Sequence, residues 1–482
     1  MHTVPNAGVR DASRAQRHAR GGALIVLWLG LVLAGCGPTG RATLTPQPNA
    51  VIRVGAVFPL TGNAAGLAGQ ELAGVRAAAE FVNADGGLGG RKIVLEVRDL
   101  PRAADAPGIM KDLRSAGVAV VIGAYASSLS IPASRAASDA GLVYWEAGAV
   151  ADQLTGDGLP LVFRVGASGS NLGANSARFA ASELAPRLGG TPGSTRVAIV
   201  AANDAYATSV AEAARSTSDA AGLEVVANLT YDLTRPDFPA TMMALQEAAP
   251  DIVILASHIP DGVAFRQAML AAKLTVGALI GSTMAECDPD FAGALGRDAI
   301  GIFASDRPTG GFRSDALSGD ARALYERFAA AWPAGLGGDR EYGSSGYGSG
   351  SYGSTSSLAP GSSASTWEIT GPVEEGSSDA GPTEEGLSGF SAAWVLFRDV
   401  LPAAGPGHPD SEAIAQAARA LDLPTGSLPN GAGVRFSTDR ATLGQNELAA
   451  AVIWQWQAVR SYTFVWPATY QTGEISFVPL DR

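Results

Sequence analysis

The sequence predicts an α/β protein with two doubly wound parallel sheets that follow one another along the chain. Short apolar runs rich in β-branched residues alternate with segments of helical spacing, which is typical of buried parallel strands joined by helices. The alternation begins near residue 51 and restarts near residue 197. The 482 residues are also enough for two or three domains.

The first α/β unit begins with the apolar run 51–58, which Pro59 ends. A helix over 70–83 follows, because its apolar residues recur on one helical face, and the glycines at 86–87 end it. The remaining elements alternate in the same way: a strand at 93–97, a helix at 104–115, a strand at 118–122, a helix at 131–139 and a strand at 141–145.

The second unit repeats this pattern after a join near 163–171. The join contains Gly166-Ala167-Ser168-Gly169, which is not G-x-G-x-x-G, and the sequence has no P-loop lysine motif, so we interpret it as a hinge crossover. The expected elements are strands at 197–201, 224–227, 252–256 and 278–280, with helices at 205–220, 239–248 and 262–271.

The segment 337–388 has a different composition, rich in Gly, Ser and Tyr and then in Glu. Such a segment has too little apolar surface to offset the entropy of ordering it, so we expect a disordered insertion. A tyrosine-bearing adhesive or regulatory loop is the alternative. Folded elements are expected to resume with helices at 389–401 and 412–421 and strands at 433–437, 450–457 and 462–466.

The first 35 residues are typical of a bacterial lipoprotein signal. Four arginines precede an apolar run at 23–34, and small residues then precede Cys36. This run is shorter than the roughly 20 residues that a membrane-spanning helix needs. We therefore expect residues 1–35 to be removed, Cys36 to carry lipid, residues 36–50 to form a tether, and the rest to be extracytoplasmic. A buried N-terminal helix with a chance cysteine is the alternative.

Composition excludes several classes of function. A net charge of −12 argues against nucleic acid and against a membrane surface recognised by basic patches. Beyond Cys36 the only thiol is Cys287, and outside the leader the only histidines are His258 and His408. These residues allow no internal disulfide and no zinc cluster. No G-x-S-x-G motif lies between a strand and a helix, so we expect neither an enzyme nor a metal or cofactor.

In open α/β sheets, ligands bind at the carboxyl ends of the strands. Tyr125, Ser127 and Ser128 follow the third strand of the first unit, where a helix begins. Free N–H groups and hydroxyls at a helix start suit an anion such as a carboxylate, although Ser127 or Ser128 could instead be an ordinary N-cap. Gly148 and Val150 follow the fourth strand, where small residues let a ligand approach the backbone.

The second unit offers three candidates at the corresponding edge of its sheet: Tyr206, Thr283 and Glu286. Tyr206 stands at a helix start, and packing at the edge is its alternative role. Glu286 could hold a cationic group, or it could be a solvated loop carboxylate.

Several segments, in this order, make the chain similar to a known family. It resembles the extracytoplasmic substrate-binding proteins of branched-chain amino acid type ABC transporters, which have the type I periplasmic-binding-protein fold. The most specific segment, 80–91, is similar to the family turn I-N-x-x-G-G-x-x-G-[RK]. The others are the P-L-T-G loop at 59–62, the ligand loop at 121–134, the Phe163-Arg164 pair before the crossover, and the C-terminal strands near 431–436 and 455–457.

The resemblance implies two lobes, joined by a multi-strand hinge, that close on a small-molecule ligand. It also implies a role for each candidate. Ser127 would bind an α-carboxylate with help from the Gly148 backbone, and Tyr206 would cover the ligand from the other lobe. The implied first lobe comprises 51–168 and 304–440, including the insertion, and the implied second lobe comprises 169–303 and 441–482.

Three positions depart from the family pattern. Val150 replaces a threonine, Thr283 replaces the acidic residue that holds the ligand ammonium, and Leu67 replaces an aromatic residue. A buried ammonium without a carboxylate is costly. Either Glu286 substitutes for the missing acid, or the ligand is an amide, a urea-like solute or an organic acid.

The resulting prediction is a monomeric, non-enzymatic lipoprotein that delivers a small polar solute to an ABC permease in the membrane. A sensory receptor subunit of the same fold and an extracytoplasmic hydrolase are the alternatives.

Overall fold

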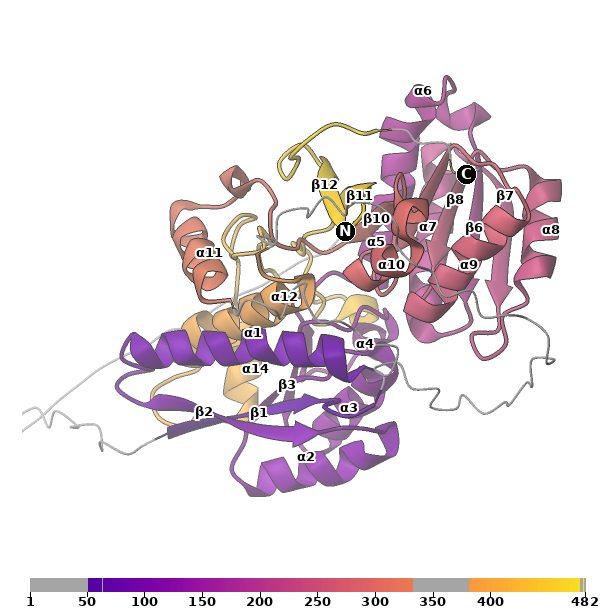
Figure 1. The fold of residues 1–482 in the computed structure, drawn as a ribbon. Coiled ribbons are helices and arrows are strands. Elements are labelled where there is room, and N and C mark those ends of the chain that lie inside the picture. The colour runs from indigo at the N-terminus through magenta and orange to yellow at the C-terminus, as the bar shows by residue number, and fades with distance from the viewer. Residues whose placement is uncertain (1–50, 63, 333–380, 477–479, 481–482) are drawn as a thin grey trace, which may run out of the picture. The chain divides into compact units, whose positions relative to one another are not determined.

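The computed structural model describes residues 51–62, 64–332, 381–476 and 480, which belong to one compact unit. The expected lipoprotein signal, Cys36 and the tether lie outside these residues, as does the expected insertion up to residue 380. The described residues contain two β-sheets with helices on both faces of each sheet (Figure 1).

The first sheet is fully parallel, in the order β2-β1-β3-β4-β5. Its central strand β1 pairs with β2 from Val51↔Lys92 to Phe58↔Asp99, and with β3 around Gly55↔Val121. The strands are β1 (Val51–Phe58), β2 (Lys92–Asp99), β3 (Val120–Gly123), β4 (Val143–Glu146) and β5 (Val162–Arg164).

Side chains of this sheet alternate between two buried layers, which explains its almost continuous apolar strands. Val54 and Ala56 of β1 pack with α1 and α12, whereas Val57 packs with α2 and α3 on the opposite face. Figure 1 shows α1 and α2 on opposite sides of β1 and β2. The helices of this lobe are α1 (Ala65–Ala84), α2 (Ala106–Ser115), α3 (Ser127–Asp139), α4 (Gln153–Gly156), α11 (Gly319–Ala331), α12 (Glu384–Val395), α13 (Leu401–Ala403) and α14 (Ser411–Arg419).

The second sheet has the order β12-β11-β10-β9-β8-β6-β7. Strands from β7 to β10 are parallel, whereas β11 and β12 are antiparallel additions from the end of the chain. Its strands are β6 (Arg196–Ala202), β7 (Glu224–Tyr231), β8 (Ile252–Ala256), β9 (Ala278–Ser282), β10 (Phe303–Asp306), β11 (Val452–Ala458) and β12 (Ser461–Trp466).

This sheet is also buried on both faces. Val197 and Ile199 pack with residues of α5 and α7, whereas Ala198 and Val200 share a cluster with residues of α8 and α9. The helices of this lobe are α5 (Gly169–Phe179), which continues as a π-helix over Ala180–Leu184, α6 (Ala185–Arg187), α7 (Ala205–Ala221), α8 (Phe238–Ala248), α9 (Ile259–Ala271) and α10 (Pro289–Leu295).

The chain passes between the two sheets three times: after β5, after β10 and before β11. Arg164 ties two of these segments together. Its backbone N–H donates to the Gly444 carbonyl at 2.9 Å, and its carbonyl accepts from the Asn446 N–H at 3.0 Å. Its guanidinium is buried and donates to the Ala151 carbonyl at 2.6 Å. The Phe163-Arg164 pair therefore fixes the crossover through a buried arginine.

The predicted fold class, two α/β lobes with parallel sheets, is confirmed. Some predicted limits are wrong. Residues 384–388 begin helix α12 rather than ending the insertion, and β10 hydrogen-bonds within the second sheet although the first lobe was expected to resume at 304. Residues 444–446 hydrogen-bond to Arg164 and Ser437, although the second lobe was expected to resume at 441.

Helix α12 starts earlier than the sequence predicts, and its first turns contact α1. Thr383 caps it, since its hydroxyl accepts the Gly386 N–H at 3.2 Å. Gly74 of α1 meets α12 closely, and a Cβ at this position would lie 2.0 Å from the Gly386 carbonyl oxygen.

Among the described residues, no helix combines the length and apolarity that crossing a membrane requires.

Candidate functional site

Helix α3 begins directly after β3, and its start carries the serine candidates. The N-cap is Ala126, which makes no side-chain cap, so the alternative that Ser127 or Ser128 is an N-cap is wrong. Ser127 lies in the first turn, and its hydroxyl accepts the Ala151 N–H at 3.1 Å. Ser128 is exposed. The first N–H groups of α3 have no carbonyl partner within their own helix and therefore suit an anion.

The loop after β4 is held by a buried carboxylate that the sequence analysis did not single out. Glu146 accepts the N–H groups of Gly148 and Ala149, both at 2.9 Å. Burial raises the pKa of Glu146. Gly148 lies close to α1, because a Cβ at this position would lie 2.0 Å from Oε2 of Glu71, whose side chain would have to shift. Val150 is buried in the same loop.

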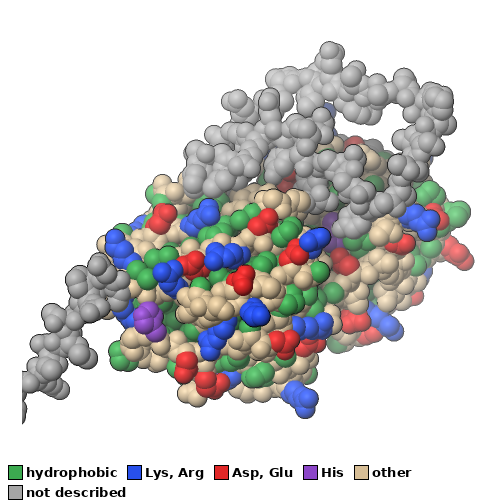
Figure 2. Space-filling model, turned by 90° about the horizontal axis from the view of Figure 1, so that it is seen from below, with side chains coloured by type: hydrophobic (Ala, Val, Ile, Leu, Met, Phe, Trp, Pro, Cys, Tyr) green, Lys and Arg blue, Asp and Glu red, His purple; other side chains and the backbone are tan. Residues whose placement is uncertain are grey.

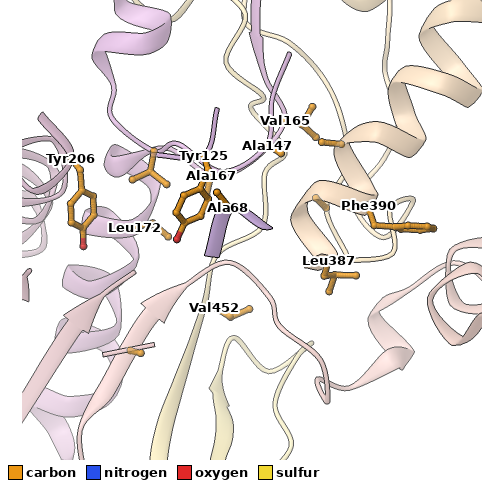
Figure 3. Packing of buried hydrophobic residues seen from close by; sticks show 14 of the residues in the cluster. Ala68, Tyr125, Ala147, Val165, Ala167, Leu172, Tyr206, Leu387, Phe390 and Val452 are labelled. Atoms are coloured by element: carbon orange, nitrogen blue, oxygen red, sulfur yellow. The ribbon is translucent and has the colours of Figure 1, made fainter. Parts of the chain in front are cut away.

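Tyr125 connects the first lobe with the second. Its backbone has φ 74°, a conformation that costs energy for a residue other than glycine, and its side chain is buried. Its hydroxyl lies 3.7 Å from the Met284 sulfur and 3.5 Å from Oε1 of Glu385. Figure 3 shows Tyr125 between Tyr206 and Leu172 on one side and residues of α12 on the other.

Tyr206 is buried at the start of α7, with its hydroxyl turned to the strand ends of its own lobe. The hydroxyl contacts the Thr283 carbonyl and lies 3.1 Å from the Ser282 carbonyl and 3.3 Å from the Ser257 carbonyl. Tyr206 therefore joins the carboxyl ends of β8 and β9. That it covers a ligand stays a prediction.

Thr283 and Glu286 are both buried, so the alternative of a solvated loop carboxylate is wrong for Glu286. Glu286 Oε1 accepts the Ser257 hydroxyl at 3.1 Å, and burial raises the pKa of Glu286 to about 8. Its side chain packs on Gly281 and Gly262 of its own lobe. Leu67, in the first turn of α1, is half-buried against the core.

The structure therefore brings the candidates together as two groups. Tyr125, Ser127, Gly148 and Val150 gather at the carboxyl ends of β3 and β4. The other group, Tyr206, Thr283 and Glu286, gathers at the ends of β8 and β9. The two groups meet where Tyr125 contacts Met284.

A cluster of buried charged residues, which the sequence analysis missed, adjoins the first group. Arg307 follows β10, and its guanidinium pairs with Glu384 and donates to the Gly148 carbonyl. We call Arg307 and the carboxylates around it the acidic cluster, whose members are Glu71, Asp288, Asp306, Arg307, Glu384 and Glu385.

One sequence feature could have revealed Glu71. It shares a helical face with the buried residues Ala68, Leu72 and Val75, where a carboxylate is unexpected. Glu384 and Glu385 were hidden because they follow directly on the Gly/Ser-rich segment.

No group of three or more His, Cys, Asp or Glu side chains among the described residues is arranged to hold a metal ion. On the face drawn in Figure 2, basic and acidic side chains are interspersed. This distribution does not provide the basic stripe typical of a nucleic-acid-binding surface.

Comparisons with known proteins agree with this geometry. Residues 51–353 match the model of a family described as periplasmic binding protein. The Leu/Ile/Val-binding protein homolog 8 of Brucella abortus (strain 2308) is 28% identical over 449 residues, which are 93% of this chain and 98% of that protein.

Two solved structures share the fold at low identity. A substrate-binding protein of Desulfitobacterium hafniense in complex with Leu has a TM-score of 0.60 at 18% identity, with 86% of this chain and 99% of that chain covered. A solute-binding protein from R. palustris in complex with benzoate has a TM-score of 0.61 at 17% identity, with 88% and 98% covered.

Proposed function

Because this chain belongs to the periplasmic binding protein family and is a solute-binding protein of that family, we propose that it delivers a small polar solute to an ABC permease. The observation that carries this proposal is the meeting of the two groups of candidate residues at the carboxyl ends of β3, β4, β8 and β9. In open α/β sheets these ends are where ligands bind.

A carboxylate is the ligand group that the start of α3 suits best. The Ser127 hydroxyl, in the first turn of this helix, accepts the Ala151 N–H at the end of the loop that contains Gly148. A relative is named as a homolog of a Leu/Ile/Val-binding protein, and solved structures of this fold contain Leu or benzoate; all of these ligands have a carboxylate. An amino acid or another small organic acid is therefore the ligand class that we propose, with an amide or urea-like solute as the alternative.

The proposed location is the outer face of a membrane, with a lipid anchor at Cys36. The lipoprotein pattern of the leader supports the anchor, and the family supports a place outside the cytoplasm. A tethered binding protein stays near its permease, which raises its effective concentration there.

A thermal-shift screen of the chain from Gly37 onward tests the proposal. The panel contains neutral, acidic and basic amino acids, acetamide, urea and benzoate. A ligand that binds only the folded state raises the melting temperature by mass action. Micromolar binding corresponds to about 8 kcal/mol, which gives a clear shift at millimolar ligand. If the folded protein responds to no member of the panel, the proposal fails.

A further inference from the structure

The acidic cluster has more negative than positive groups. Four carboxyl groups, those of Glu71, Asp306, Glu384 and Glu385, interact with the single guanidinium of Arg307, and Asp288 adjoins Glu385. All six side chains are at most 9% exposed. Buried carboxylates without matching cations are costly, because desolvation and mutual repulsion both oppose their charge. Burial, followed by the neighbouring charges, raises the pKa of Glu71 and of Glu385 well above the usual range.

Arg307 is already engaged by other groups. Its Nη2 donates to Glu384 Oε2 at 2.9 Å, its Nε forms an ion pair with the same carboxylate, and its Nη1 donates to the Gly148 carbonyl. Glu384 also accepts the Ser388 hydroxyl at 2.9 Å. This pair satisfies its own charges and leaves Glu71 and Glu385 without a full ionic partner among the residues described.

Glu71 is the clearest case. Its side chain is 0% exposed, and neither of its oxygens has a hydrogen-bond partner among the described residues. Oε2 lies against Gly148, where a Cβ would be 2.0 Å away and would also lie 2.9 Å from the Tyr125 ring. The unpartnered carboxylate thus points at the same loop and the same tyrosine as the candidate ligand-binding residues.

Glu385 reaches this place from the other side. Its Oε1 lies 3.5 Å from the Tyr125 hydroxyl, which in turn contacts Met284 of the second lobe. Glu71 and Glu385 therefore flank Tyr125, one from α1 and the other from α12.

We propose that the solute carries a positively charged amine or guanidinium group in its side chain, which Glu71 and Glu385 bind beside Tyr125. This inference rests on the proposed function and names its substrate class, a small organic cation such as an amino acid with a basic side chain. Glu286 is the other candidate for holding a cationic group. Its side chain instead accepts the Ser257 hydroxyl and packs within its own lobe.

Matched ligand pairs test the charge directly. Isothermal titration of the chain from Gly37 onward compares L-arginine with L-citrulline, and L-lysine with L-norleucine. The two members of each pair have similar size and share the α-ammonium and the α-carboxylate, but only the first member carries a cationic side chain. We expect the cationic member to bind at least tenfold more tightly. Equal affinity within both pairs, or binding of neutral or acidic ligands alone, overturns the cation assignment and leaves the proposed function standing.

Three variants at buried carboxylates and one exposed control locate the cation. Glu71→Gln should weaken arginine binding by more than tenfold, while Glu80→Gln, an exposed site on the same helix, should leave it unchanged. Glu385→Gln repeats the test if Glu71→Gln does not fold. Full affinity in both cluster variants, with loss in Glu286→Gln, would move the cation to Glu286 and reject our assignment. Failure of every ligand in the wild type rejects the proposed function itself.

Discussion

Two buried side chains of opposite charge show how single residues differ in their roles. Arg164 has protein partners for its guanidinium: the carbonyl of Ala151, the side chain of Gln445 and the hydroxyl of Thr155. Glu71 is equally buried but has no hydrogen-bond partner among the described residues. A fold tolerates a buried charge that has hydrogen-bond partners, whereas a buried charge without partners is costly unless a ligand or a proton neutralises it.

Ser127→Ala should weaken binding of a carboxylate ligand by about 1–3 kcal/mol, because a hydrogen bond to a charged group is lost. Titration calorimetry measures the affinity, and thermal melting measures the stability. The second measurement is needed because Ser127 also accepts the Ala151 N–H. Ser128→Ala, in the same helical turn, is the control that should keep full affinity. An unchanged affinity in Ser127→Ala would limit Ser127 to tying the loop to α3.

His258 makes stability depend on pH. Burial alone would lower the pKa of His258, but hydrogen bonds and charges from Asp204 and Asp261 outweigh it and raise the pKa to about 9. The pKa of His258 in the folded protein therefore lies above its usual value of 6.5. Protonated His258 stabilises the folded state fully below pH 6.5, and this stabilisation is lost as the pH rises to about 9.

Urea unfolding of the wild type and of His258→Gln at several pH values checks this expectation. Relative to the wild type, the free energy of unfolding of the variant should be lower by up to about 3 kcal/mol at pH 6 and by much less at pH 9.5. His408→Gln is the control. A variant whose deficit is the same at both pH values would show that His258 contributes by packing alone.

At the scale of elements, the sequence predicts strands and helices that have a regular apolar pattern, and it does not predict elements that lack one. Strand β8 is apolar throughout, β1 is apolar except for the exposed Arg53, and the sequence predicts both almost to the residue. Helix α5 was missed because Gly, Ser and Asn dominate its first half. The sequence does not predict strand β10, because it has only four residues and two of them are polar.

The site was predicted only in part, for a physical reason. Residues that follow strands could be found, because the ends of parallel strands meet at one edge of a sheet. The contact of Glu71 with Gly148, and that of Tyr125 with Glu385, join segments far apart in the sequence. Such contacts depend on how α1 and α12 pack, and no local pattern encodes that.

Deleting residues 343–378 should leave ligand binding and melting temperature nearly unchanged. The flanking ends lie close together, since Trp332 packs on Gly386, and the remaining residues can connect them. Titration and melting of the deletion variant measure both properties. A variant that also removes 379–388 is the contrast and should fail, because it cuts into α12 and the acidic cluster. A large loss in the first variant would show that the segment supports the fold.

At the scale of the whole molecule, the two lobes exchange chain segments three times, so neither lobe is continuous in sequence. If the lobes close on a ligand, as the family resemblance implies, the movement must occur at these crossings. Arg164 and Arg307 both lie there, next to the loop that contains Gly148. This places the charges of the acidic cluster where a ligand could influence the crossings.

Cys36→Ser should release the protein from membranes, because the thioether that carries lipid can no longer form. Fractionation of cells into membrane and soluble material, followed by immunoblotting, measures the distribution. Cys287→Ser is the matched control and should stay with the membrane fraction, since Cys287 lies within the folded second lobe. Retention of Cys36→Ser on the membrane would reject the proposed anchor.

The place of β11 has a consequence for how the protein is made. β11 and β12 complete the second sheet beside β10, although they come from the last part of the chain. Until that part has been synthesised, β10 presents an unpaired edge, to which another chain can add. Chains that end before Val452 should therefore aggregate during biogenesis, even though the residues of the candidate site have already been synthesised.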